Sequence, residues 1–268
     1  MTTNTLPKRS GLWKSVLWLV IFLMVLFVSG SISGVDLARF FSNSSQMNVI
    51  LQKMAHPDWA YAKIIVEPIL QTIQMAIIGT TFGALAAFPF SLLAARNIMT
   101  NHWISGCFRF VLNIIRTVPD LMLAALFVAI VGIGPVAGVI SISVFSFGMI
   151  TKLFYESIET IDEGPIEAIT ASGGSKFDII RYAVVPQVMS HFLSYLLYAF
   201  EINVRASTIL GYIGAGGIGV FLQRSLSQFR YDQTSIIVLV IFAVVLVIDT
   251  ISNRLRERLL SVSYTHLT

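Results

Sequence analysis

The chain has 268 residues, of which 56% are hydrophobic and only 12% are charged, and its formal net charge at pH 7 is +4. Soluble domains usually carry about 25% charged residues, so this composition excludes a water-soluble domain with an ordinary charged surface. The single cysteine, Cys107, excludes an intrachain disulfide. The small positive charge requires no nucleic-acid partner, because the inward-facing loops of membrane proteins are normally basic.

Long segments without charged residues predict helices that span a membrane, each of which needs roughly 20 mainly apolar residues. The charge-free segments are 15–35, 68–95, 121–151 and 182–200, and a further apolar run covers 234–248. The third segment is interrupted by the turn-like run V-G-I-G-P at 131–135. We therefore predict an all-α, polytopic membrane protein with six transmembrane helices, near residues 15–35, 69–95, 110–131, 136–155, 187–210 and 233–252.

The first predicted span has two interpretations. Its basic start, with Lys8, Arg9 and Lys14, and the small residues at 29–31 are also found in cleaved signal peptides. Its apolar run, however, is longer than the core of about 7–15 residues that signal peptides use. We therefore favour an uncleaved anchor helix.

The distribution of Lys and Arg predicts which loops face the cytoplasm. With the N-terminus inside, the inward-facing segments hold twelve of the eighteen basic residues and the outward-facing segments hold six. This bias predicts that both termini are cytoplasmic. It places segments 36–67 and 211–232 outside the membrane and segment 156–185 inside.

The internal segment, residues 156–185, reads as two short helices. Thr160 with Glu163, and Ser175 with Asp178, have the spacing of a capping box, in which each side chain satisfies an amide at the start of a helix. We therefore predict that one helix begins after Thr160 and the next begins after Ser175.

The turn between these helices contains Gly173 and Gly174, and glycine permits a sharp bend without a Cβ penalty. Pro186 marks the start of the next span. A bent helical pair on the cytoplasmic side is a suitable shape for docking with a partner protein. From the residues alone, an ordinary solvated connector is the favoured interpretation, and docking is the alternative.

A resemblance favours docking. The run E-A-I-T-A-S-G at 167–173, followed by Pro186, resembles the EAA loop of permeases from ATP-binding-cassette (ABC) importers. As in that loop, a glycine follows the glutamate by six positions and a proline follows the glycine by thirteen. Ile169 and Val185 depart from the pattern but keep its apolar face. The resemblance implies that the loop couples to a cleft of an ATPase subunit through Glu167, Ala168, Gly173, Gly174 and Pro186.

Other segments resemble the phosphonate branch of these permeases. They are R-T-V-P-D at 116–120, K-L-F-Y-E at 152–156, F-E-I-N-V-R-A-S-T at 200–208 and G-A-G-G-I-G at 214–219. The resemblance implies a type I importer permease domain at 67–258, similar to that of methionine importers. An anchor helix and an external segment at 1–66 precede this domain. A tail at 259–268, with an end typical of a cloning or sequencing remnant, follows it.

The glycines at 214, 216 and 219 match G-x-G-x-x-G, the dinucleotide-binding pattern. That mechanism needs a strand before the glycines and a helix after them, within a βαβ unit. Here a predicted membrane span precedes the glycines, so we reject nucleotide binding. We interpret the run as a close-packed external loop and a candidate gate, formed by Gly214, Gly216, Gly217 and Gly219.

Ionisable residues near the membrane are costly and are candidates for function. Arg116 and Asp120 are four positions apart, as are Glu201 and Arg205, which suits pairing along one helix face, although Pro119 can distort the first pair. Two interpretations stay open: self-neutralised structural pairs, or an arginine that offers charge along the route of an anionic substrate. The candidate pathway residues are Arg116, Asp120, Glu201, Asn203 and Arg205.

Another acidic residue, Asp249, lies near the end of the last predicted span. We expect its side chain to reach the membrane interface or to pair with Arg254.

No catalytic constellation is evident, so we predict that the chain is not an enzyme. The four histidines, at 56, 102, 191 and 266, are scattered and lack the spacing of metal ligands, so no metal is expected. The sequence also lacks the G-x-x-x-x-G-K-[ST] loop that binds nucleotide phosphates. ATP and Mg²⁺ are therefore expected to bind a partner ATPase rather than this chain.

Taken together, the resemblance implies the permease of an ATP-driven importer that moves phosphonates across the bacterial inner membrane. It implies a permease homodimer, two ATPase subunits and a periplasmic or lipid-anchored phosphonate-binding protein, with membrane lipid around the spans. Two alternatives stay open. One is an importer for another small solute, such as phosphite, a phosphate ester or an amino acid, and the other is a membrane scaffold without transport.

Overall fold

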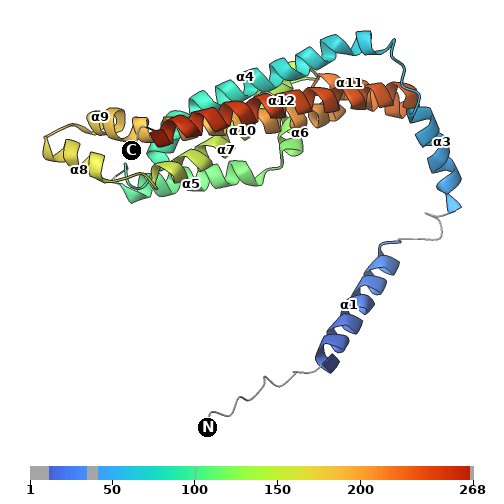
Figure 1. Cartoon of the computed structure of the whole chain (residues 1–268), viewed down its shortest axis with the longest axis horizontal. Coiled ribbons are helices and arrows are strands. Elements are labelled where there is room, and N and C mark those ends of the chain that lie inside the picture. The colour runs from blue at the N-terminus through green and yellow to red at the C-terminus, as the bar shows by residue number, and fades with distance from the viewer. Residues whose placement is uncertain (1–11, 35–41, 100, 266–268) are drawn as a thin grey trace. The chain divides into compact units, whose positions relative to one another are not determined.

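The computed structural model describes residues 12–34, 42–99 and 101–265 (Figure 1). Within these ranges every regular element is a helix, which confirms the predicted all-α class. The chain divides into two compact units, residues 1–53 and 54–268, and each is described by itself. The predicted domain boundaries after residues 66 and 258 stay a prediction. Lys8, Arg9 and the last three tail residues lie outside the described ranges.

The first unit contains α1 (Leu12–Ile32) and nearly all of α3 (Ser44–Met54). Large apolar side chains such as Trp13, Phe22 and Phe27 project from all sides of α1 and are exposed. A helix that is apolar around its whole circumference needs lipid or protein around it. The helix is also long enough to cross a membrane, as predicted for the first span.

The second unit is a bundle of long helices with shorter elements at its ends. Helices α4, α7, α10 and α12 run side by side, α8 and α9 lie beyond one end, and α11 lies toward the other (Figure 1). In chain order the elements are α4 (Ala62–Ala94), α5 (His102–Thr117), α6 (Asp120–Val131), α7 (Pro135–Ile158), α8 (Gly164–Ala171), α9 (Lys176–Asp178), a π-helix (Ile179–Val184), α10 (Val185–Leu210), a 3₁₀ turn (Gly211–Ile213), α11 (Ile218–Ser227) and α12 (Tyr231–Thr265).

The predicted third span, 110–131, is not one straight helix. Helices α5 and α6 meet at an angle of 87°, and the break lies at Val118 and Pro119. Pro119 has no N–H for the helix ladder, and its ring disfavours helical backbone at the preceding residue. Val118 accordingly has ψ 121°. Among the described residues, five helices are long and apolar enough to cross a membrane, or six if this bent pair counts as one span.

The most extensive contact in the bundle is between α4 and α7, and small residues make it possible. A Cβ on Gly79 would lie 2.6 Å from Cγ2 of Ile142, and one on Gly83 would lie 2.6 Å from the carbonyl oxygen of Ser143. Small residues at such contacts let two helix backbones approach closely, and the resulting van der Waals packing is one of the forces that associate helices in lipid. This pair of helices therefore forms the centre of the second unit.

Candidate functional site

The segment predicted to dock with a partner is a two-helix loop, residues 159–178, at the end of the bundle where α7 stops and α10 begins (Figure 1). No residue of α8 is buried, and Glu167 and Ala168 are both exposed. Pro186 is exposed in the first turn of α10. The structure thus brings the predicted loop residues to one end of the molecule with their surfaces free within this chain.

The turn between α8 and α9 has the geometry of a Schellman motif. The N–H of Gly173 donates to the carbonyl oxygen of Thr170 (3.0 Å), and the N–H of Gly174 donates to that of Ile169 (3.0 Å). Gly173 has φ +79°, the left-handed backbone that this motif requires and that glycine adopts without strain. The predicted bend at the glycine pair is confirmed.

One predicted capping box is formed and the other is wrong. The Ser175 side chain accepts from the Asp178 N–H (3.3 Å), and Asp178 accepts from the Ser175 N–H (2.9 Å). Thr160 instead donates back to the carbonyl oxygen of Ser157 (2.9 Å) and so ends α7. Helix α8 starts only at Gly164, where the N–H donates to Asp162 Oδ1 (3.0 Å). The turn between α7 and α8 is thus longer than the spacing implied.

The predicted Arg116–Asp120 pair is not formed, because the break at Pro119 puts the two residues on helices that diverge. Arg116 is exposed in the last turn of α5, and its aliphatic carbons lie against Gly148 of α7. Asp120 instead accepts from the N–H of Leu121 (3.2 Å) at the start of α6. A four-residue spacing brings charges together only where the helix is continuous.

The predicted Glu201–Arg205 pair is formed and belongs to a larger network between α10 and α12. Arg205 pairs with Glu201 and also with Asp249 (3.0 Å). Glu201 in turn pairs with Arg256 (2.9 Å), whose guanidinium lies 5.5 Å from the ring centre of Tyr198. The pairing of Asp249 with Arg254 was therefore a wrong prediction, since Asp249 binds Arg205.

The side chain of Asn203 faces away from this network and into the bundle. It is fully buried, and its Nδ2 donates to Thr80 Oγ1 (2.7 Å) on α4 and to Ser146 Oγ (2.6 Å) on α7. Its Oδ1 accepts no hydrogen bond from the described residues. Asn203 thus ties three helices together, whereas Glu201 and Arg205 lie at the α10–α12 contact.

The glycine loop, residues 211–219, is packed against α4 and the start of α7. The N–H of Gly217 donates to Gln71 Oε1 (2.9 Å), and the N–H of Ile218 donates to Thr72 Oγ1 (2.8 Å). The Gly134 N–H donates to the carbonyl oxygen of Gly214 (2.9 Å). These contacts are consistent with the predicted close-packed loop. Helix α11 begins within the same loop, at Ile218.

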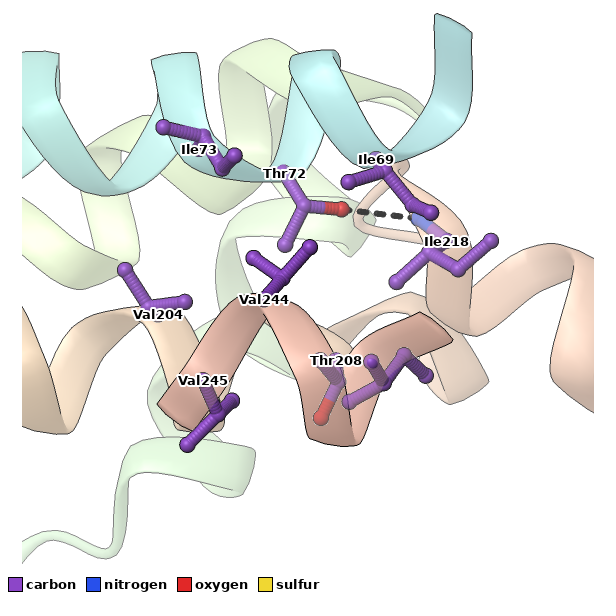
Figure 2. Close-up of a pocket in the computed structure, with 9 residues that line it drawn as sticks. Ile69, Thr72, Ile73, Val204, Thr208, Ile218, Val244 and Val245 are labelled. Atoms are coloured by element: carbon purple, nitrogen blue, oxygen red, sulfur yellow. Dashed lines mark hydrogen bonds between the residues drawn. The ribbon is translucent and has the colours of Figure 1, made fainter. Parts of the chain in front are cut away.

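A small apolar cavity lies beside this loop, among α4, α10, α11 and α12 (Figure 2). Its volume, about 10 Å³, is close to that of one water molecule, far below the roughly 300–1,000 Å³ of typical ligand sites. Figure 2 shows Thr72 bonded to Ile218 at its edge. The cavity is therefore too small to be a solute site. Its lining is Ile69, Thr72, Ile73, Val204, Thr208, Ile218, Ile241, Val244 and Val245.

The sequence reasoning missed Arg256, which completes the α10–α12 network, and the two side chains of α4 that hold the glycine loop. Arg256 is 55 positions from Glu201, and Thr72 is 146 positions from Ile218. No local spacing links such residues. The only available signal was that Glu201 and Asp249 are acidic residues in otherwise apolar helices, which require partners.

Comparison with known proteins identifies the family. Residues 79–261 match the model for "Binding-protein-dependent transport system inner membrane component". The putative phosphite transport system permease protein HtxC of Stutzerimonas stutzeri is 36% identical over 241 residues, which are 90% of this chain and 86% of that protein. The putative cryptic phosphonate transport system permease protein PhnE2 of Escherichia coli K12 is 42% identical over 118 residues, which are 44% of this chain and 97% of that protein.

Among solved structures, the inward-facing MetNI methionine ABC transporter matches with a TM-score of 0.67 and 21% identity, over 75% of this chain and 99% of that chain. This likeness shows the fold, which is the type I importer permease fold that the sequence predicted. Such a permease works with an ATPase and a substrate-binding protein. The chain therefore belongs to the binding-protein-dependent transport system inner membrane components, the multi-pass permease subunits of ABC importers, and is a transport protein rather than an enzyme.

Proposed function

We propose that this permease imports phosphonates, with phosphite as the second candidate substrate. The observation that carries the substrate class is the similarity to two permeases named for phosphorus oxyanions, one for phosphite and one for phosphonate. The similarity to the phosphite permease extends over 90% of this chain, so phosphite is kept as the second candidate substrate. Both solutes are small anions of tetrahedral phosphorus, so one route with cationic groups along it suits either.

Transport would be driven through the two-helix loop. Its exposed α8, with Glu167 and Ala168, and its fixed bend at Gly173 are suited to insertion into a cleft of an ATPase subunit. ATP and Mg²⁺ would bind that partner. In the assembly that we propose, two copies of the permease pair with two ATPase subunits and an external phosphonate-binding protein.

The solute route would lie between the two permease copies, since the cavity among α4, α10, α11 and α12 is too small to hold a phosphonate. Arg205 is the strongest candidate to meet an anion there, since nearly half of its side chain is exposed although it contacts two carboxylates. Arg116 is a second candidate, as an exposed arginine. The glycine loop, at the opposite end from α8, would form the external gate.

The proposed orientation has both termini in the cytoplasm, which places the two-helix loop on the ATPase side. Reporter fusions at position 100 are expected to read as cytoplasmic, and fusions at position 45 as external. The reverse pattern would overturn the orientation and, with it, the proposed docking site.

The substrate proposal is tested by deleting the gene and supplying one phosphorus source at a time. We expect loss of growth on methylphosphonate and retained growth on phosphate. Uptake of labelled phosphite in the same strain distinguishes the second candidate. If phosphite uptake alone is lost, the chain is a phosphite permease, and if neither is affected in a strain without a redundant system, the substrate class is wrong.

A further inference from the structure

The end of α7, from which the chain enters the two-helix loop, is tied to the end of α4. Glu159, the residue that follows α7, accepts at Oε1 from the N–H of Arg96 (2.8 Å). The side chain of Asn97 donates to the carbonyl oxygen of Ile158 (2.7 Å). Two segments about 60 positions apart in the chain are thus joined through backbone groups as well as side chains.

Arg109 extends this junction to α5. It pairs with Glu159, its Nε donates to the carbonyl oxygen of Ala94 (2.9 Å), and its guanidinium lies 4.4 Å from the ring centre of Tyr155. The Ser105 hydroxyl donates to the same carbonyl oxygen (2.7 Å). The side chains of Arg109 and Glu159 are only 18% and 26% exposed, so solvent competes weakly with these contacts.

An apolar core surrounds the junction. Ala94, Leu112, Tyr155 and Ile158 are buried in one hydrophobic cluster with residues of α10. Charge-assisted hydrogen bonds that are directed at backbone groups and set in a packed core hold their geometry better than pairs on a solvated surface. The ends of α4 and α7 are therefore held together with α5 as one bonded and packed block.

The loop itself is anchored again only three residues further on. The N–H of Asp162 donates to Gln187 Oε1 (3.0 Å), and Gln187 Nε2 donates to the Asp162 carbonyl oxygen (3.3 Å) and to that of Ala183 (2.9 Å). Helix α8 starts at Gly164. A push on α8 thus reaches Glu159 through a short segment that is held on both sides.

We propose that Arg109 and Glu159 are positioning residues that convert movement of the two-helix loop into joint movement of α4, α5 and α7. The proposal rests on the coupling role of that loop. Without the Arg109–Glu159 pair, a displaced α8 would bend the chain at the end of α7 and leave α4 and α5 behind, because coupling travels through contiguous packed and bonded groups. ATP hydrolysis would then continue while less solute crosses.

The experiment uses the full complex of permease, ATPase and binding protein in lipid vesicles, with methylphosphonate as the solute. The variants are Glu159→Gln, which keeps an acceptor for the Arg96 N–H but loses the charge, Glu159→Ala, and Arg109→Lys. The control is Glu156→Gln, which breaks an ion pair with Lys152 within α7 and so joins no second helix. The readouts are solute uptake, ATP hydrolysis and co-purification of the ATPase.

We expect Glu159→Ala to keep the ATPase bound and hydrolysing while the solute moved per ATP falls about fivefold, at the low end of typical coupling between sites. For Glu159→Gln and Arg109→Lys, the solute moved per ATP should lie between the values for Glu159→Ala and for the control. The control should match wild type. The positioning role is wrong if Glu159→Ala lowers uptake and hydrolysis in proportion or leaves both unchanged. It is also wrong if the ATPase no longer co-purifies with this variant. Absence of methylphosphonate uptake in wild type would instead refute the proposed substrate.

Discussion

The two-helix loop and the glycine loop both contain glycines that their structures require, but for different physical reasons. Gly173 is exposed, has φ +79°, and a Cβ there would meet nothing within 4 Å. Gly219 is buried, and a Cβ there would lie 2.0 Å from the carbonyl oxygen of Thr208 and 2.8 Å from Cα of Gly211. One position requires glycine for its backbone conformation, and the other requires it for lack of a side chain.

The difference separates assembly of the fold from contact with a partner. The glycine loop is bonded to α4 and to the start of α7, so a change there disturbs the bundle itself. The two-helix loop is joined to the bundle mainly near its start, by Arg96 and Arg109 at Glu159 and by Gln187 at Asp162, and the rest is held by its own hydrogen bonds. A change at its tip should leave the bundle intact and affect transport only through the proposed docking.

The largest effect is expected for Gly219→Ala. A methyl group 2.0 Å from a backbone oxygen cannot be accommodated by a side-chain movement, so the end of α10 must separate from α11. Overpacking of this kind costs about 1–3 kcal/mol and sometimes more. We expect a strongly reduced amount of protein in the membrane and a lower melting temperature in detergent.

The matched control is Gly106→Ala on α5, where a Cβ would meet nothing within 4 Å and alanine favours the helix. This variant should accumulate as wild type does. Equal stability of the two variants would mean that the glycine loop is not packed as described, and the contrast with Gly173 would disappear.

The second prediction is Gly173→Asp, which should reach the membrane at a near-normal level and lose transport. The left-handed backbone costs a residue with a Cβ about 1–2 kcal/mol, and the added charge would face the docked ATPase. Gly173→Ala should have a milder effect, since it adds one methyl group. Solute uptake and co-purification of the ATPase check this prediction. If Gly173→Asp retains both, the loop is only a connector and does not dock with the ATPase.

A smaller loss is expected for Thr72→Val, which keeps the shape of the side chain but removes the acceptor for the buried N–H of Ile218. A buried amide left without a partner costs about 1–3 kcal/mol. The control, Thr81→Val, removes an exposed hydroxyl that bonds only within its own helix. If thermal unfolding shows equal losses for both variants, the bond from α4 does not hold the glycine loop.

The predictions that held depend on residues that are near neighbours in the chain. Charge-free runs predicted the long helices, the V-G-I-G-P run predicted the break before α7, and the Ser175–Asp178 spacing predicted a capping box that is formed. Each of these depends on residues within one or two helical turns of one another. Periodicity and turn chemistry are properties of such short segments.

Prediction failed where two local signals competed or where partners are distant in the chain. The spacing of Arg116 and Asp120 favoured a pair, but Pro119 ended the helix between them. For Asp249 the sequence offered only the membrane interface or the nearby Arg254, whereas its partner in the structure, Arg205, is 44 positions away. The Arg109–Glu159 pair also involves residues 50 positions apart, since only the folded bundle brings the middle of α5 to the end of α7.

The smallest effect is expected for Ser175→Ala, because the capping box is local and exposed. The hydroxyl oxygen of Ser175 accepts a hydrogen bond from the Asp178 N–H, and the backbone N–H of Ser175 donates to the Asp178 carboxylate. This capping box therefore fixes where α9 begins. Loss of a cap should raise the exchange rate of the α9 amides by about fivefold, a typical effect of an N-cap. The melting temperature of the bundle should stay unchanged, because no core residue moves.

Hydrogen exchange measured on the complete chain in lipid checks this prediction, with Ser172→Ala as the control. The Ser172 hydroxyl donates only to the carbonyl oxygen of Ala168, one turn back in α8, so its loss should leave α9 unchanged. If Ser175→Ala also destabilises the glycine loop, the two loops are coupled through the bundle. If exchange in α9 does not change, the bend at Gly173 alone positions that helix, and the side chains of the loop matter less than its backbone.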